Sequence, residues 1–434
     1  MLKIEKINVI VCKHCGNDEP SEYHRMGTQP VKRKGGITVR YQVFQCKKCD
    51  RLFSFPIEAI EHLDYKKQDP SHVHKETKEE KEPLNVKILR SKITQLETAL
   101  DKANAFQEII IEAVKDEVKA LPPIKPPVIE IKGKYCEEYA VLDFSDVQIG
   151  SLVTSKEVSG LAQYGKDDMR KRIKELTKSI YSIVNIQRVG GVPLKKLKIH
   201  VLGDIVQGEN VYHGQGFKLD ALLLEQVFEL GAELIELLFM PMAELFEDVE
   251  IFCIPGNHGS QGKQGDVSRN TNWDYVTYIF WKTLMQEIKH VKFHISAAPF
   301  LLYEMFPDQI HCLIHGQQAR GWMGMPYYGI DRMHRRLMAL TGVYISFLHH
   351  GHHHQPSIQD THIGKKIGNG SIEGGSDYSV NDLLTANTPQ QFFFGINEKG
   401  MTWEYWIKLE DYRRLHPGDS GILTTLMFEG DKNE

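Results

Sequence analysis

The chain has 434 residues, and 41% of them are hydrophobic and 25% charged. These fractions are ordinary for a soluble globular protein, and the formal net charge of −4 gives no global signature of nucleic-acid binding. No apolar stretch approaches membrane-spanning length, and the amino terminus "MLKIEKINVIVCKHCG" lacks the long apolar segment and cleavage site of a signal peptide. We therefore expect a cytoplasmic protein without a membrane partner, built from one large domain with smaller appendages.

Two pairs of cysteines in residues 1–60 have the spacing of a zinc site. Cys12 and Cys15 form one C-x-x-C pair, and Cys46 and Cys49 form the other. Each pair suits a tight turn, and the strand-like segment between them lets the two turns close on one tetrahedral Zn²⁺ ion. Disulfides are not expected in a cytoplasmic protein with an odd number of cysteines. The alternative to a zinc site is two unrelated pairs of reduced cysteines. The pattern predicts a zinc ribbon with one structural zinc.

Basic side chains gather within the predicted ribbon. They are Lys32, Arg33, Lys34, Arg40, Lys47 and Lys48. Such a cluster can bind the phosphate backbone of a nucleic acid without sequence preference, or it can be the solvated face of a small domain. The segment with "CKHCG" and "CKKCD" also resembles the amino-terminal zinc ribbons of transposases and other DNA-handling proteins. This resemblance implies DNA as a partner.

A charged linker is expected over residues 61–82, followed by a long helix over 83–121. Within this helix apolar residues recur every three or four positions and so form one apolar stripe, here called the seam. Gln107 is the one polar residue in it. The repeat predicts either a coiled coil that forms a homodimer, or a single helix that docks on the catalytic domain. The segment "LPPIKPP" then ends the helix, and residues 122–133 are interpreted as a stiff spacer.

Residues 134–410 contain five short apolar runs that each end in a residue able to bind a metal. The runs are "YAVLDFSDVQIG", "LKIHVLGDIVQGEN", "VEIFCIPGNHG", "IHCLIHGQ" and "VYISFLHHGHHH". We interpret them as buried strands of an α/β domain with a largely parallel sheet, separated by helices, one of which is expected to end or kink at Pro241. Ligand sites gather beyond the carboxyl ends of such strands, where this chain places Asp146, Asp204, Asn257, His315, His352 and His354. This set is sufficient for two divalent metals.

The motifs "SDVQIG", "GDIVQGEN", "GNHG", "HGQ" and "GHHH" appear in an order that resembles the calcineurin-like metallophosphoesterase superfamily. The resemblance covers roughly residues 138–410 and implies an α/β/β/α sandwich with a two-metal site that cleaves phosphomonoesters or phosphodiesters. It implies that Asp204 bridges the two ions, and that His258 protonates the leaving oxygen. It further assigns Asp146 and His354 to one ion, and Asn257, His315 and His352 to the other.

One residue departs from the family pattern, because Gln148 stands where the first motif usually has histidine. An amide oxygen is a harder and weaker ligand than imidazole, so we expect Mn²⁺, or alternatively Mg²⁺, rather than Zn²⁺ in the active site. His349 and His350 are alternative ligands in the last motif, although the Gly-His-x-His frame favours the later pair. Asn272 and Asp274 are candidate substrate contacts or ordinary loop residues.

The leading functional hypothesis is a two-metal phosphodiesterase that acts on DNA as an exo- or endonuclease by hydroxide attack on phosphorus. The family resemblance points to SbcD-type DNA-repair nucleases and similar phage phosphoesterases. An ATPase partner is not predicted, since only about eighty residues follow the last motif, ending in a polar tail over 411–434. The alternatives are a phosphomonoesterase or phosphoprotein phosphatase, and a catalytically weak scaffold that binds nucleic acid.

Overall fold

The computed structural model describes residues 10–19, 23–32, 38–60, 84–130, 136–158, 160–212, 214–261, 271–319, 326–382 and 385–410. The chain divides into two compact units, Met1–Ser91 and Lys92–Glu434. The predicted linker over 61–82 and the tail over 411–434 lie outside the described residues, as do Arg33 and Lys34. No helix in the described part of the chain is long and apolar enough to span a membrane.

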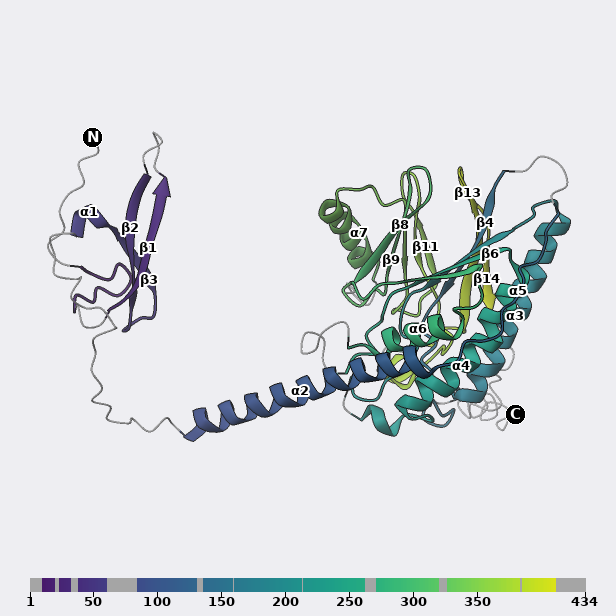
Figure 1. Cartoon of the computed structure of the whole chain (residues 1–434), viewed down its shortest axis with the longest axis horizontal. Helices are drawn as coiled ribbons and strands as arrows, with labels where there is room; N and C mark the ends of the chain where they lie inside the picture. Colours follow the sequence, from purple (N-terminus) through teal and green to yellow (C-terminus); the bar gives the residue numbers. More distant parts are fainter. Residues whose placement is uncertain are drawn as a thin grey trace, which may run out of the picture. The chain divides into compact units, whose positions relative to one another are not determined.

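The first unit is a three-stranded antiparallel sheet of order β1-β2-β3 (Figure 1). Its elements are β1 (Tyr23–Lys32), β2 (Thr38–Cys46), β3 (Leu52–Pro56) and the short helix α1 (Ile57–Ile60). Tyr23, Phe44 and Phe53 pack ring against ring, with centroids 5.3–6.3 Å apart. This aromatic cluster forms the small core because alternate residues of each strand face the same side of the sheet.

The second unit contains a six-stranded sheet of order β14-β13-β4-β5-β6-β7. Strands β4 to β7 are parallel, as the buried apolar runs predict, whereas β13 and β14 continue the sheet in antiparallel orientation. The strands are β4 (Glu138–Phe144), β5 (Lys196–Val201), β6 (Asp248–Cys253), β7 (Val291–Ile295), β13 (Gln390–Asn397) and β14 (Gly400–Lys408).

A second sheet of five strands has the order β11-β12-β10-β9-β8. Its strands are β8 (Phe300–Phe306), β9 (Gln309–Ile314), β10 (Phe347–His350), β11 (Ser357–Asp360) and β12 (Lys365–Gly368). The predicted strand endings are therefore divided between two sheets, because β4, β5 and β6 belong to the first and β9 and β10 to the second. This division matches the two sheets of the sandwich that the resemblance implies, and the largely parallel sheet expected from the strand and helix order is formed by β4 to β7.

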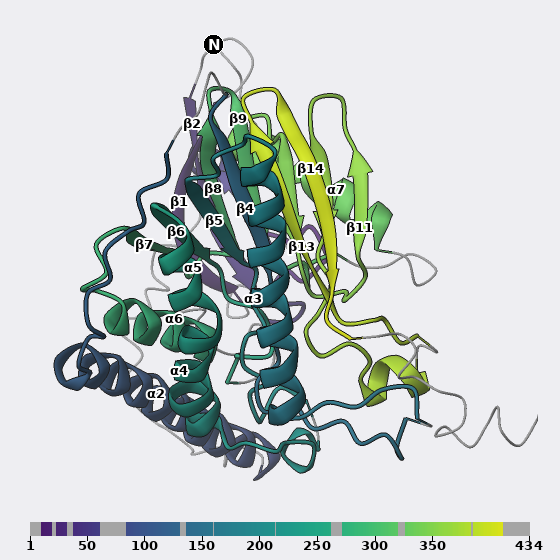
Figure 2. The ribbon, with the colours of Figure 1, turned by 90° about the vertical axis from the view of Figure 1, so that its right-hand side faces the viewer.

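The two sheets pack face to face and helices cover their outer faces, which gives four layers (Figures 1 and 2). Val141, Phe347 and Phe392 lie in the apolar core between the sheets. The outer face of the five-stranded sheet is covered by α7 (Tyr327–Thr341). The six-stranded sheet is covered by α3 (Lys166–Val189), α6 (Trp273–Leu284) and a helical run composed of η5 (Glu225–Glu229), α4 (Leu230–Leu234), η6 (Ile235–Phe239) and α5 (Met240–Leu245). The short elements η4 (Gln215–Phe217) and η7 (Tyr378–Asp382) complete the described fold.

The helical run does not end at Pro241. It continues through α5 to Leu245, and Phe246 then adopts an extended conformation. The residues before Pro241 form a π-helical turn, so the proline occupies the first turn of α5, where its missing N–H and its ring are tolerated. The prediction that the helix ends at this proline was therefore wrong, and a kink there stays a prediction.

The long helix α2 (Leu84–Glu117) docks on the second unit through its carboxyl-terminal half. Gln107 and Val114 are buried, and Ile110 packs into the core of the unit. Beyond the helix, the N–H of Leu121 donates to the carbonyl of Leu284 over 2.7 Å. Ile93, further back on the same predicted seam, is 53% exposed. Docking thus accounts for the end of the seam, and a homodimer through 83–121 stays a prediction.

Candidate metal centre

The candidate site lies where the carboxyl ends of β4, β5, β6, β9 and β10 meet. Backbone hydrogen bonds tie the loops together, because the N–H of Asp146 donates to the carbonyl of Gly203 over 3.1 Å, and the N–H of Gln148 to the carbonyl of Asp204 over 3.0 Å. The N–H of His352 donates to the Asp146 carboxylate over 3.1 Å and so joins the two sheets. Loops that are far apart in the sequence therefore form one connected site.

The backbone of the site is held in the left-handed region. Positive φ angles occur at eight non-glycine residues in the described ranges, and five of these are predicted metal ligands. The five are Asp146, Gln148, Asp204, His352 and His354, with φ between 51° and 69°. Each such conformation costs on the order of 1–3 kcal/mol and persists only where its surroundings enforce it, which is typical of functional sites.

Gly256 allows the Asn257 loop to approach the Asp204 loop. A Cβ atom at this position would overlap with both the carboxylate and the backbone nitrogen of Asp204. Any side chain would therefore push the two loops apart. The glycine that precedes Asn257 is required by close packing within the site.

Three acceptor atoms converge on the predicted position of one ion. The Nε2 atom of His315 lies 3.1 Å from Oδ1 of Asn257 and 2.9 Å from Oδ2 of Asp204. The Nδ1–H of His315 donates to the carbonyl of Leu202 over 2.7 Å, which leaves a lone pair on Nε2 in the neutral ring. Three lone pairs at this separation repel one another unless a cation lies between them.

The charge balance of this cluster also indicates a cation. Burial alone would lower the pKa of His315, but the neighbouring Asp204 carboxylate outweighs it and raises the pKa to about 9. Oδ2 of Asp204 is buried and has no hydrogen-bond partner, and ligand atoms of Asp204, His315 and His352 lie within 4.8 Å of one another. Either a proton or a metal ion supplies the missing positive charge, and the residues fit a divalent ion.

The residues predicted for the other ion are also adjacent. Nε2 of His354 lies 3.3 Å from Oδ1 of Asp146 and 3.3 Å from the side-chain amide of Gln148. Rotation of the Gln148 amide by 180° would direct its oxygen to the ion in place of its nitrogen. Burial opposes protonation of His354, but the Asp146 carboxylate raises its pKa to about 9. This half of the site therefore also combines a buried carboxylate with an imidazole, and its negative charge likewise favours a bound cation.

His258 lies beside the predicted bridging carboxylate. Its backbone N–H donates to Oδ1 of Asp204 over 2.7 Å, and its Nε2 atom lies 4.0 Å from Oδ2. The side chain is 20% exposed, so it reaches both the site and the solvent. The ring of Tyr212 stands edge-on to the imidazole at 6.3 Å. The imidazole is thus placed at the rim of the site.

His349 and His350 do not take part in the site. His349 hydrogen-bonds to the buried Asp143 carboxylate between the sheets, and Nδ1 of His350 bonds to the carbonyl of Gly351. Both side chains are buried away from the cluster around Asp204. Of the alternatives left open by the sequence, the structure brings the later pair, His352 and His354, to the centre.

Asp274 holds the backbone of the two loops that carry Asp204 and Asn257. Its fully buried carboxylate accepts four backbone N–H groups, from Asp204, Ile205, Val206 and Gly256, at 2.8–3.1 Å. Burial and the Asp204 charge raise its pKa to about 6, against the N–H donors, which lower it. Asn272 begins α6 and donates to the carbonyl of Gly256. Asn272 and Asp274 are thus buried residues that hold the loops of Asp204 and Gly256, so they are neither the substrate contacts nor the surface loop residues that the sequence allowed.

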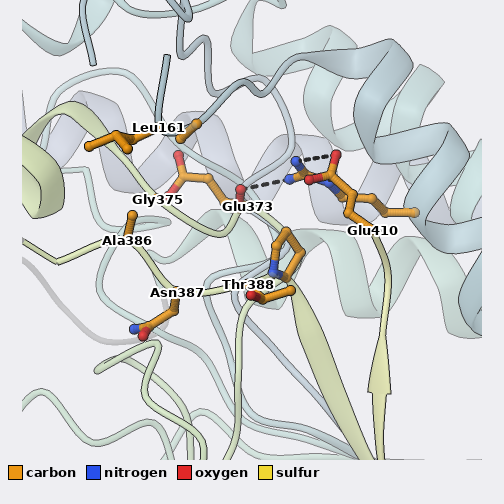
Figure 3. A pocket seen from close by; sticks show the side chains of 10 residues that line it. Leu161, Glu373, Gly375, Ala386, Asn387, Thr388 and Glu410 are labelled. Carbon is orange, nitrogen blue, oxygen red and sulfur yellow. Dashed lines mark hydrogen bonds and ion pairs between the residues drawn. The ribbon is translucent and has the colours of Figure 1, made fainter. Parts of the chain in front are cut away.

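A second buried carboxylate near the site belongs to Glu373, in the segment after β12. Glu373 accepts the hydroxyl of Ser151 over 2.5 Å and lies within electrostatic reach of His354. Arg172 of α3 fixes this segment, because its guanidinium donates to the carbonyls of Ile372 and Glu373 and to the carboxylate of Glu410. Glu373 and Glu410 line the same small cavity (Figure 3). A cavity of about 20 Å³ beside Glu373 has room for roughly one water molecule.

In the first unit, the four predicted zinc ligands lie together. The sulfur atoms of Cys12 and Cys49 are 3.6 Å apart, as are those of Cys15 and Cys46. The N–H groups of Gly16 and Asp50 donate to the carbonyls of Cys12 and Cys46, which closes two tight turns. Four thiols at these separations fit a tetrahedral zinc ion.

Of the predicted nucleic-acid contacts, Arg40, Lys47 and Lys48 have exposed side chains. Lys32 ends β1, and its side chain lies outside the described part of the structure. Phe44, which lies among these basic residues in the sequence, is buried in the aromatic core. It is therefore not available to stack on a base.

Comparison with known proteins gave solved structures only, since no family model and no curated protein matches the chain. A Vps29 from Entamoeba histolytica complexed with Zn²⁺ is 12% identical, with a TM-score of 0.28, over 62% of this chain and 92% of that chain. An archaeal phosphodiesterase is 13% identical, with a TM-score of 0.29, over 62% and 99%. A predicted phosphoesterase from Streptococcus pneumoniae is 10% identical, with a TM-score of 0.23, over 63% and 99%. At these values the similarity does not assign the chain to a family.

Proposed function

We propose that the protein is a metal-dependent phosphodiesterase of the calcineurin-like type that hydrolyses DNA. The observation that carries this proposal is the convergence of Asp204, Asn257 and His315, because Nε2 of His315 lies 2.9 Å from Oδ2 of Asp204 and 3.1 Å from Oδ1 of Asn257 in a buried, negatively charged cluster. An oxygen-rich cluster with imidazoles suits Mn²⁺. The five ordered motifs and the four layers of the catalytic unit support the same assignment.

Each residue has a distinct role in this proposal. Asp204 would contribute to both metal positions, Asn257, His315 and His352 would hold one ion, and Asp146, Gln148 and His354 would hold the other. Two divalent ions would supply Lewis-acid activation of water and neutralise the charge of the phosphate. His258, 4.0 Å from the shared carboxylate, gives a proton to the leaving oxygen as the bond from phosphorus breaks.

DNA is the proposed substrate because of the first unit. Its exposed cations, Arg40 and Lys48 among them, supply affinity for a phosphate backbone that does not depend on sequence. The four-cysteine cluster supports a zinc ribbon that presents these cations on a small stable sheet. The first unit would therefore hold the polymer, and the second would cleave it.

A comparison of three substrates tests this function. With Mn²⁺, we expect the full chain to hydrolyse bis-p-nitrophenyl phosphate and single-stranded DNA faster than p-nitrophenyl phosphate. Arg40→Gln together with Lys48→Gln should weaken DNA binding and lower the slope of its salt dependence by about one per lost phosphate contact. The same double variant should hydrolyse bis-p-nitrophenyl phosphate at the wild-type rate.

Other outcomes would redirect the proposal. Preferential hydrolysis of p-nitrophenyl phosphate would identify a phosphomonoesterase. Mn²⁺-loaded protein that shifts DNA in a gel without cutting it would identify a nucleic-acid-binding scaffold. An unchanged salt dependence in the double variant would show that the ribbon does not bind DNA.

A further inference from the structure

A layer of polar side chains crosses the apolar interface between the two sheets. In the six-stranded sheet it contains Asp143 of β4 and His200 of β5, and in the five-stranded sheet Tyr303 of β8, His311 of β9 and His349 of β10. Asp143, His200, His311 and His349 are all fully buried. Polar groups buried in an apolar interface are costly unless they are all hydrogen-bonded, so their arrangement requires a physical explanation.

The five side chains form one continuous chain of hydrogen bonds. Nδ1 of His200 lies 2.7 Å from Oδ1 of Asp143, and Nδ1 of His349 lies 2.8 Å from Oδ2. The outer nitrogens continue the chain, since Nε2 of His200 is 2.6 Å from the hydroxyl of Tyr303, and Nε2 of His349 is 3.0 Å from Nδ1 of His311. The carboxylate of Asp143 therefore links the sheets through one imidazole on each side.

The protons in this chain can be assigned with every imidazole neutral. Tyr303 donates to His200, His200 and His349 each donate to Asp143, and His311 donates to His349. Burial lowers the pKa of His200 to about 4 and that of His311 well below its usual value. Burial opposes ionisation of Asp143, but the two imidazoles outweigh it and lower its pKa to about 2. Asp143 thus carries the one negative charge of this layer.

Asp143, His200 and His349 have the composition of a metal site, but their geometry is different. Both oxygens of Asp143 already accept an N–H from a ring nitrogen, whereas metal ligands direct lone pairs at a common point. At the metal centre, by contrast, Nε2 of His315 lies 3.1 Å from Oδ1 of Asn257 and 2.9 Å from Oδ2 of Asp204, while Nδ1 of the same ring already donates to a carbonyl. The inter-sheet layer is therefore a hydrogen-bonded link.

The position of the layer along the strands relates it to the metal centre. Each of its four charged or imidazole residues precedes, by three or four positions, a predicted ligand in the loop that follows the same strand. The pairs are Asp143 with Asp146, His200 with Asp204, His311 with His315, and His349 with His352. The layer thus connects the strands immediately before they deliver ligands from the two sheets.

We propose that this polar layer is a positioning device that fixes the offset between the two sheets and thereby the separation of the two ions. The inference rests on the proposed two-metal function. The surrounding contacts, such as those of Val141, Phe347 and Phe392, are apolar and non-directional, so they permit small shifts of one sheet over the other. Hydrogen bonds depend strongly on distance and angle, and they specify a single offset.

Electron paramagnetic resonance of the Mn²⁺-loaded full chain tests this inference, because exchange coupling between two Mn²⁺ ions depends on their separation. We expect a coupled pair in the wild type, and loss of that coupling in His349→Leu with a decrease in kcat of about tenfold or more. His349→Asn retains an N–H near the Nδ1 position and should restore most of the coupling. Phe392→Leu, in the same interface, is the control for a comparable loss of stability and should keep the coupled signal.

If His349→Leu does not fold, His311→Phe supplies the same test. Its ring can keep the stacking of His311 on Phe347, where the centroids are 4.6 Å apart, but it removes the donor to His349. A coupled signal that is unchanged in the folded variant would overturn the positioning role. The polar layer would then contribute only to the stability of the fold. Absence of a coupled pair in the wild type would instead contradict the proposed two-metal site.

Discussion

Replacement of His258 by alanine is expected to decrease kcat for DNA hydrolysis by about 10²–10⁴-fold, the usual contribution of a general acid. The effect should depend on the leaving group. A nucleoside alkoxide needs a proton as it leaves, whereas p-nitrophenolate is stable without one, so bis-p-nitrophenyl phosphate should lose at least about tenfold less activity than DNA. Steady-state kinetics on both substrates, with Mn²⁺ content measured on the same samples, provides the comparison.

His362→Ala is the matched control, since it removes an exposed imidazole from the loop between β11 and β12. It should leave both rates unchanged. An equal decrease on both substrates in His258→Ala would mean that the imidazole does not act as a proton donor to the leaving oxygen. Loss of bound Mn²⁺ in that variant would assign His258 to metal binding.

Replacement of Asp274 by alanine is expected to destabilise the catalytic unit by about 4 kcal/mol or more. The substitution leaves four backbone N–H groups without an acceptor in a buried position, and each such group costs roughly 1–3 kcal/mol. It also frees the loops that carry Asp204 and Asn257, so Mn²⁺ should bind more weakly. Urea unfolding followed by tryptophan fluorescence reports on this unit, because all five tryptophans lie after residue 270.

Asp167→Ala is the matched control for Asp274→Ala. Asp167 is also an acidic residue in the first turn of a helix, but its side chain is 81% exposed. Its loss should cost less than about 1 kcal/mol, which is the range of exposed helix-terminal charges. Equal free energies of unfolding for the two variants would show that the four hydrogen bonds to Asp274 are not important for stability.

The strands that lead to the candidate site could be predicted from the sequence because each one combines an apolar run with a polar ending. Asp146, Asp204 and His315 stand directly after such runs, and the structure brings these three side chains into one site. The ligand roles of these residues stay predictions until a metal is measured. The clustering of the four N-terminal cysteines could be predicted in the same way, since C-x-x-C spacing constrains the local turn.

The parts that could not be predicted depend on contacts between distant segments. Nothing in the local pattern around Asp143 or His200 distinguishes an inter-sheet hydrogen bond from an ordinary strand residue, and the assignment of strands to two sheets is equally non-local. Asp274 follows the N-cap of a helix, so its position alone favoured a surface role, whereas its four N–H partners come from other loops.

Asp204 is proposed to hold two divalent ions that activate water against a phosphodiester. Elemental analysis and Mn²⁺ titration of the wild type and of Asp204→Asn, combined with hydrolysis of bis-p-nitrophenyl phosphate on the same samples, test it most directly. We predict about one zinc per chain in both proteins, and about two Mn²⁺ ions with Mn²⁺-dependent hydrolysis in the wild type alone. Full Mn²⁺ binding and hydrolysis in Asp204→Asn, or a wild type that binds no Mn²⁺, would contradict the claim.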